Sequence, residues 1–96
     1  MNSRMLWSRI LMDCRKVEFG KMEKPGDFRF DDSFAWIYIW LPGSCSPDAV
    51  QIQRGAPGGQ RIWGWDGNTD KPTLTPSILA PGQWHGWLLV GRLVSC

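Results

Sequence analysis

The 96-residue sequence has no long apolar run and no block of like charges. Its longest apolar stretch, residues 34–42, is too short to span a bilayer. Arg4, Arg9 and Asp13 interrupt the apolar residues near the N-terminus, so the continuous core of a signal peptide is absent there. We therefore expect a protein that resides in the cytoplasm and makes no contact with a membrane.

Cysteine is also scarce. The three cysteines, Cys14, Cys45 and Cys96, are odd in number and contain no CxxC pair. A secreted scaffold that depends on disulfides would carry a denser and even set. We expect three reduced thiols.

The charge is mild, with 11 Lys and Arg against 9 Asp and Glu and a net charge of +2. This balance does not indicate a dedicated nucleic-acid or anionic-membrane protein. Trp63 and Trp65, with Arg61 and Lys71 close by, could stack single-stranded bases. Two cations do not form a groove for a phosphate backbone, however, so nucleic acid is not the expected partner.

Tryptophan is what the chain has in excess, with seven tryptophans beside four phenylalanines and one tyrosine. The length fits a single domain over residues 1–96. Each aromatic side chain can bury roughly 150–250 Å², which helps a small core. Seven indoles exceed what such a core readily hides, so some are expected at the surface and indicate a binding face.

Pro and Gly interrupt the sequence at short intervals, which favours a mainly-β fold, with a β-rich α+β fold as the alternative. We predict five or six short strands in a small antiparallel sheet that is rolled toward a barrel or sandwich. Residues 15–96 form this β core. Apolar residues at helical spacing predict an arm or short helix within residues 1–13. The predicted strands cover residues 15–22, 34–41, 50–52, 62–65 and a final hairpin of 84–90 with 92–96.

The clearest strand is the run 34–41, which is rich in aromatic and β-branched residues. Trp36, Tyr38 and Trp40 lie on one face, and the aliphatic residues between them lie on the other. Such a strand is either central in its sheet or presents its aromatic face to a partner.

The most distinctive stretch starts with the strand that holds Trp63 and Trp65, whose rings project from one face. The turn that follows presents the acceptors Asp66, Asn68 and Asp70. We predict that these five residues form the surface that binds a partner. The alternation of the three acceptors resembles the start of a calcium loop, but the glycine and glutamate of an EF-hand are missing, so an Asx-stabilised turn is the better interpretation.

The run WxWDGNxxKPTLTPSI and the ending WHGWLxxGRxxSC resemble an uncharacterised family of small proteins encoded by tailed phages and prophages, some of which carry the label "ammonia monooxygenase". The resemblance covers roughly residues 15–96. It implies no established activity. Members often show Cys and His positions suggestive of zinc, and Cys45, His85 and Cys96 match part of that set. Gly43 stands where a further cysteine is often found, and a structural zinc site wants four ligands, so no cofactor is expected and zinc is the alternative.

A catalytic alternative would use Cys45 as nucleophile and His85 as base, oriented by Asp66 or Asp70. These residue types alone do not distinguish this chain from many others, so we expect no enzyme. The expected function is that of a phage- or prophage-encoded accessory protein in the host cytoplasm. It would bind a host or phage protein and inhibit a host enzyme or an antiviral defence complex. A zinc-stabilised structural module is the first alternative to this function, and a small Cys/His enzyme is the second.

Overall fold

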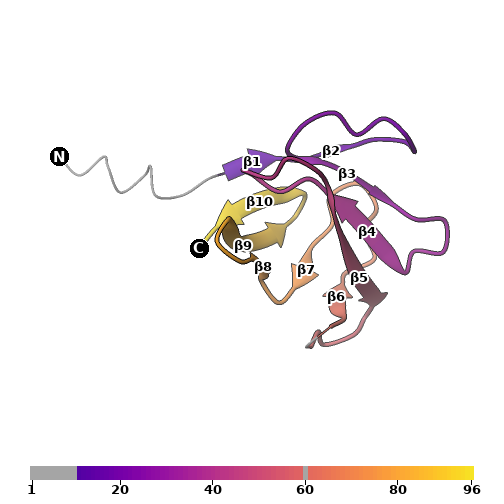
Figure 1. Cartoon of the computed structure of the whole chain (residues 1–96). Helices are drawn as coiled ribbons and strands as arrows, with labels where there is room; N and C mark the ends of the chain where they lie inside the picture. The colour runs from indigo at the N-terminus through magenta and orange to yellow at the C-terminus, as the bar shows by residue number, and fades with distance from the viewer. Residues whose placement is uncertain (1–10, 60) are drawn as a thin grey trace.

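The computed structural model describes residues 11–59 and 61–96. These residues form ten strands and no helix, and the prediction of a mainly-β fold is confirmed (Figure 1). The strands are β1 (Leu11–Asp13), β2 (Arg15–Lys16), β3 (Asp27–Phe30), β4 (Trp36–Ile39), β5 (Asp48–Arg54), β6 (Trp63–Trp65), β7 (Leu74–Thr75), β8 (Ile78–Ala80), β9 (Trp84–Leu89) and β10 (Arg92–Ser95).

The strands form two sheets. One sheet has four strands in the order β1-β10-β9-β8, and all of its pairs are antiparallel. The other has six strands in the order β2-β3-β4-β5-β6-β7, in which β2–β3 and β5–β6 are parallel pairs. The chain passes from the six-stranded sheet to the four-stranded sheet between β7 and β8, through Pro76 and Ser77.

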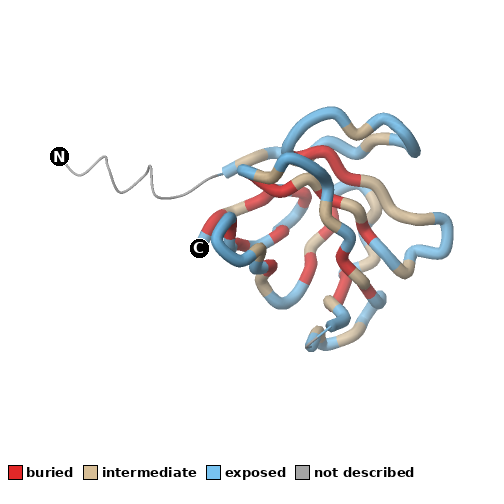
Figure 2. The backbone as a smooth tube through the Cα atoms, viewed as in Figure 1, coloured by how far each residue is buried: buried red, intermediate tan, exposed pale blue. Residues whose placement is uncertain are grey.

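Both sheets contribute to one apolar core. The buried residues are Phe28, Ile37, Ile39, Leu41, Val50, Ile52, Trp65 and Leu74 from the six-stranded sheet and its loops, with Ile78, Trp84, Leu88 and Leu93 from the four-stranded sheet. Figure 2 shows this buried interior between the sheets, with exposed loops around it. The alternation along β9, where every second residue is buried, places one face on this core and the other at the surface.

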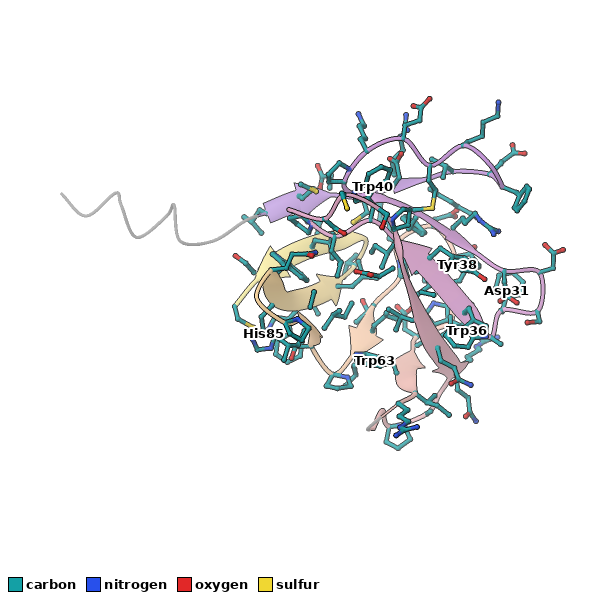
Figure 3. All side chains as sticks on the ribbon, in the orientation of Figure 1. Asp31, Trp36, Tyr38, Trp40, Trp63 and His85 are labelled. Atoms are coloured by element: carbon teal, nitrogen blue, oxygen red, sulfur yellow. The ribbon has the colours of Figure 1, made fainter. Side chains whose placement is uncertain are left out.

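Strand β4 occupies an interior position in its sheet, between β3 and β5. Its aliphatic residues Ile37 and Ile39 are fully buried, whereas Trp36 is 37% exposed on the opposite face. The turn before it is held by Asp31, whose carboxylate accepts the backbone N–H groups of Ala35 and Trp36, each at 2.9 Å (Figure 3). The predicted separation of an aliphatic face and an aromatic face is therefore present.

The predicted strands are found with different bounds. The run 15–22 contributes only the two-residue β2, and the strands at 27–30, 74–75 and 78–80 were not expected. The predicted arm or helix falls mostly on residues outside the described part of the chain. Its last three residues, 11–13, form β1, because they pair with residues 92–94 of β10.

The final hairpin is confirmed. Strands β9 and β10 pair around Val90 and Gly91, which both have positive φ angles of 46° and 73°. Two positive φ angles are typical of the tight hairpin turn whose twist matches the flanking strands. In the described part of the chain, no helix is long and apolar enough to cross a membrane.

Candidate functional site

A serine and the only histidine of the chain meet where the two sheets join. The Oγ atom of Ser77 lies 3.0 Å from the Nε2 atom of His85. Ser77 immediately precedes β8, and His85 lies on the neighbouring strand β9. In the tautomer that carries its proton on Nδ1, the imidazole accepts the hydrogen bond from the serine hydroxyl through Nε2. This arrangement is that of a nucleophile next to a general base.

The pairing of β8 with β9 explains why these two residues meet. Leu79 lies opposite His85 in the antiparallel register, and Ile78 lies opposite Gly86. Ile78 is buried, whereas Leu79 and His85 point to the exposed face. Ser77 is one residue before Ile78 and therefore projects to the same face as Leu79, on the diagonal from His85.

Ser77 is anchored on both sides. Leu74 and Ile78 enter the core and fix the two ends of the short crossover. The indole Nε1 of Trp63 donates a hydrogen bond of 3.2 Å to the backbone carbonyl of Ser77. Figure 3 shows the side chain of Trp63 on β6, in the sheet opposite to that of His85. The serine is thus held by both sheets while its hydroxyl is half-buried and accessible.

A groove of about 650 Å³ begins at the neighbours of this pair: Ile78, which follows Ser77, and Leu79, which lies opposite His85, line it, whereas Ser77 and His85 do not. Its lining includes Ile78, Leu79 and Ala80 of β8, and it extends across to β5 and to Trp63. The volume is in the range of about 300–1,000 Å³ that is usual for ligand sites. Strand β8 therefore connects the hydroxyl–imidazole pair to a depression of the size that holds a ligand.

The predicted partner-binding residues are placed differently from the expectation. Trp65 is only 7% exposed, packs in the core and donates through Nε1 to the carbonyl of Asn68 at 3.0 Å. Its assignment as a binding anchor is corrected, because a buried ring offers no surface to a partner. Gly64, between the two tryptophans, lets another part of the backbone approach closely, because the Ala56 carbonyl and the Gly58 nitrogen lie against its Cα.

The turn after Trp65 uses its acceptors internally. The Asp66 carboxylate accepts the backbone N–H of Asn68 at 3.0 Å, and the Asn68 side chain accepts those of Asp70 at 2.9 Å and Lys71 at 2.8 Å. Asp70 forms an exposed ion pair of 3.5 Å with a lysine. The Asx-stabilised turn is confirmed, and the three residues are exposed.

The predicted zinc residues are not gathered. Among the residues that the structure describes, no three His, Cys, Asp or Glu side chains are grouped so that they could hold a metal ion. Cys45 and Cys96 are exposed free thiols. His85 contacts a serine hydroxyl, so the alternative nucleophile Cys45 is replaced by Ser77.

Sequence reasoning missed Ser77 because it did not predict strand β8. The signal was nevertheless present: Pro81-Gly82 is a turn signal, and an apolar triplet precedes it at residues 78–80. A hairpin around that turn brings residues 77 and 85 onto one face of two neighbouring strands.

Comparison with known proteins gives one match. The model of the family described as "bacterial ubiquitination-like system serine protease (BubE)" matches residues 15–96. The match spans most of the chain, so the protein belongs to this family. No curated protein and no solved structure matches the sequence. The expectation that the chain is not an enzyme is wrong, because the family to which it belongs is described as a serine protease family.

Proposed function

We propose that this member of the BubE family is a serine hydrolase that cleaves a peptide bond, with Ser77 as the nucleophile and His85 as the general base. The observation that carries the proposal is the 3.0 Å contact between Ser77 Oγ and His85 Nε2. The family description supports it, and it suggests that the substrate is a protein of a bacterial ubiquitination-like system.

The chemistry follows from the pair. As the Ser77 oxygen attacks the carbonyl carbon of the substrate, its proton passes to His85 Nε2, and a tetrahedral adduct forms. The adduct then collapses: the C–N bond breaks, and the imidazolium gives its proton to the departing amine. A water molecule next attacks the acyl-serine ester, with His85 again as base, and this releases the carboxylic acid and restores the Ser77 hydroxyl.

The position of His85 suits this role because the imidazole is exposed and can exchange protons with solvent between steps. Only the neutral ring can accept the serine proton. In the described part of the chain, no Asp or Glu side chain bonds to the His85 ring.

A fluorophosphonate probe, which phosphonylates activated serines, tests this proposal. We expect the purified protein to be labelled on Ser77, as located by mass spectrometry of its peptides. Ser77→Ala and His85→Ala should abolish labelling. Ser46→Ala is the matched control, since Ser46 is an exposed serine outside the site. Labelling that persists in Ser77→Ala, or that is unaffected by His85→Ala, would rule out this pair.

The expected origin in a phage or prophage, the cytoplasmic location and the inhibition of a host enzyme or defence complex remain predictions. A pull-down from host lysate with the Ser77→Ala protein, which would retain a bound substrate, identifies the partner in either case.

A further inference from the structure

The groove beside Ser77 is bordered by strand edges that lack a partner strand. Strand β8 is the last strand of the four-stranded sheet, and β9 is its neighbour on one side. Across the groove lies the first half of β5, which pairs with β4 on one side. The pairing of β5 with β6 begins only at Ile52. In the described part of the chain, residues 48–50 thus have no strand on their second side.

On the β8 side, the backbone of Leu79 is directed toward the open edge. The carbonyl of His85 accepts the N–H of Cys96, so the backbone groups of His85 point toward β10. In an antiparallel pair, residues alternate between bonded and non-bonded pairs. Leu79, opposite His85, is therefore a non-bonded residue with respect to β9, and its N–H and C=O point away from that strand.

The same reasoning applies to β5. The N–H of Ile52 donates to the carbonyl of Ala35, so Ile52 directs its backbone toward β4. Alternation then directs the N–H and C=O of Ala49 and the N–H of Gln51 toward the opposite side, where the Gln51 C=O already takes part in the parallel pairing with β6, and both residues line the groove. Two edges with outward-facing backbone donors and acceptors therefore flank one depression.

We infer that this groove binds the substrate as an extended peptide strand that pairs with the edge of β8, on the acyl side of the bond that Ser77 attacks. The inference rests on the proposed function. An extended chain supplies donors and acceptors at the spacing that a strand edge requires, as in other cases of strand addition. Leu79 directs both its N–H and its C=O outward. In an antiparallel strand, the C=O and N–H of one residue pair with both of them.

The direction of the added strand determines which half of the substrate occupies the groove. Ser77 is two residues before Leu79. In an antiparallel partner, the residue opposite Ser77 is thus two positions C-terminal to the residue that pairs with Leu79. The chain that lies along β8 is therefore the acyl half, and the amine half leaves beyond Ser77.

The lining of the groove selects an apolar side chain. A substrate residue opposite Leu79 shares the exposed face with it, so the next residue toward Ser77 points inward. The inward direction leads to Leu41, Val50 and Ile78, which are at most 6% exposed, with Trp36 and Trp63 at the sides. A leucine-like or aromatic side chain within the last two acyl-side residues fits this surface, whereas a carboxylate directed at Leu41, Val50 and Ile78 would lose its water to apolar neighbours, with Arg61 elsewhere in the lining.

The test compares two kinds of reactive probe on the full-length protein. A simple fluorophosphonate reports on the Ser77–His85 pair alone. Acetyl-tripeptide diphenyl phosphonates, with leucine, alanine or aspartate at each position, report on the groove. We expect leucine at one of the last two positions to raise the rate of Ser77 labelling at least about tenfold over alanine, with aspartate below alanine. Equal rates, or a preference confined to the first position, would overturn the inference.

Backbone pairing is tested first by changing the probe and then by changing the protein. Methylation of the peptide nitrogen that faces Leu79 should lower the labelling rate about tenfold, whereas methylation of the neighbouring nitrogens should have a smaller effect. Leu79→Pro deletes the outward N–H at an edge position where proline is tolerated. It should lower the rate of Ser77 labelling by the peptidyl phosphonate relative to the rate with the simple fluorophosphonate. Leu79→Ala is its matched control. If this ratio of labelling rates is equal in Leu79→Pro and Leu79→Ala, and methylation of the probe has no effect, the inference that the substrate pairs with β8 is overturned.

The outcomes separate the two proposals. If the simple probe does not label Ser77, the proposed function fails. The groove is then judged by titration of the same peptides as unreactive amides, followed by the intrinsic tryptophan fluorescence, to which Trp36 and Trp63 in the groove lining contribute. Saturable binding that prefers leucine over aspartate would support the groove by itself, and no preference would reject it.

Discussion

Trp63 Nε1 donates a hydrogen bond of 3.2 Å to the carbonyl oxygen of Ser77, and this bond ties the six-stranded sheet to the residue that immediately precedes strand β8. The Ser77 hydroxyl in turn lies 3.0 Å from His85 on β9. One indole therefore links β6 to the pair on the opposite sheet. This connection leads to the first prediction.

Trp63→Phe should slow the labelling of Ser77 by a simple fluorophosphonate about three- to tenfold. The phenyl ring retains much of the packing but loses a bond worth about 0.5–1.5 kcal/mol, so the crossover at Ser77 is less well fixed. Trp65→Phe is the matched control, since its Nε1 donates to the carbonyl of Asn68, away from the pair. Labelling rates and melting temperatures are measured on both variants. A control that slows labelling as much as Trp63→Phe would show that only general destabilisation is at work.

Asp27 is fully buried and stabilises the loop between β2 and β3. Its carboxylate accepts two hydrogen bonds from the Arg15 guanidinium, at 2.9 and 2.8 Å, and further bonds from the backbone N–H groups of Glu23 and Lys24. Asp27→Asn should lower the free energy of unfolding by about 1–3 kcal/mol, because buried donors lose their charged acceptor. Urea unfolding at pH 7 measures this loss, with the exposed Asp32→Asn as control.

The same carboxylate predicts sensitivity to acid. The hydrogen bonds from Arg15, and then those from the backbone, hold the pKa of Asp27 below the ordinary aspartate value of 3.8. Because the pKa of Asp27 is lowered in the folded state, the ionised carboxylate contributes its full stabilisation well above pH 3.8. That stabilisation is lost as the pH falls toward the pKa of Asp27 in the folded protein. The melting temperature of the unaltered protein should therefore drop more steeply below pH 4 than that of Asp27→Asn. Parallel curves for the two proteins would contradict this.

The three thiols should react at different rates. Burial raises the pKa of the Cys14 thiol to about 12, so its thiolate is scarce at neutral pH. Cys45 and Cys96 are exposed. We expect iodoacetamide at pH 8 to alkylate both exposed thiols while Cys14 reacts at least about a hundredfold more slowly in the folded protein. Peptide mass spectrometry over a time course measures the three rates, and a denatured sample in which all three react alike is the control.

Gly64 should not tolerate a side chain. A Cβ atom at this position would overlap the carbonyl oxygen of Ala56, a backbone atom that cannot move independently. Gly64→Ala should cost about 1–3 kcal/mol of stability through overpacking. Gly59→Ala, where a Cβ would meet no atom within 4 Å, should change stability by less than about 0.5 kcal/mol. Equal melting temperatures for the two variants would show that the loop near Ala56 is free to shift.

The sequence supported the fold class well because its signals were local. Alternation in residues 34–41 predicted the buried aliphatic face of β4, and Gly91 predicted the turn between β9 and β10. The strands that were missed are two to four residues long, and their apolar content is too small to show a period. Strand β7 holds only Leu74 and Thr75, and it is a strand because β6 lies beside it.

The candidate site was largely hidden from the sequence. His85 was recognised as chemically important, but its partner could be chosen only by geometry, and the thiol of Cys45 was a more conspicuous nucleophile than one serine among several. Trp65 illustrates the same difficulty in reverse. Its alternation with Trp63 placed both rings on one face, yet only the packing of the two sheets decides that this ring is buried.

By itself, the sequence determined that the chain is a β protein with one aromatic-rich central strand and a closing hairpin, because turn chemistry and period-two patterning act between near neighbours. Only the tertiary structure decided that Ser77 stands beside His85, that β8 is the edge strand of its sheet among the described residues and that a groove lies between β8 and β5. The physical reason is that the register between strands, and the gap between two sheets, depend on contacts between residues that are distant in the chain.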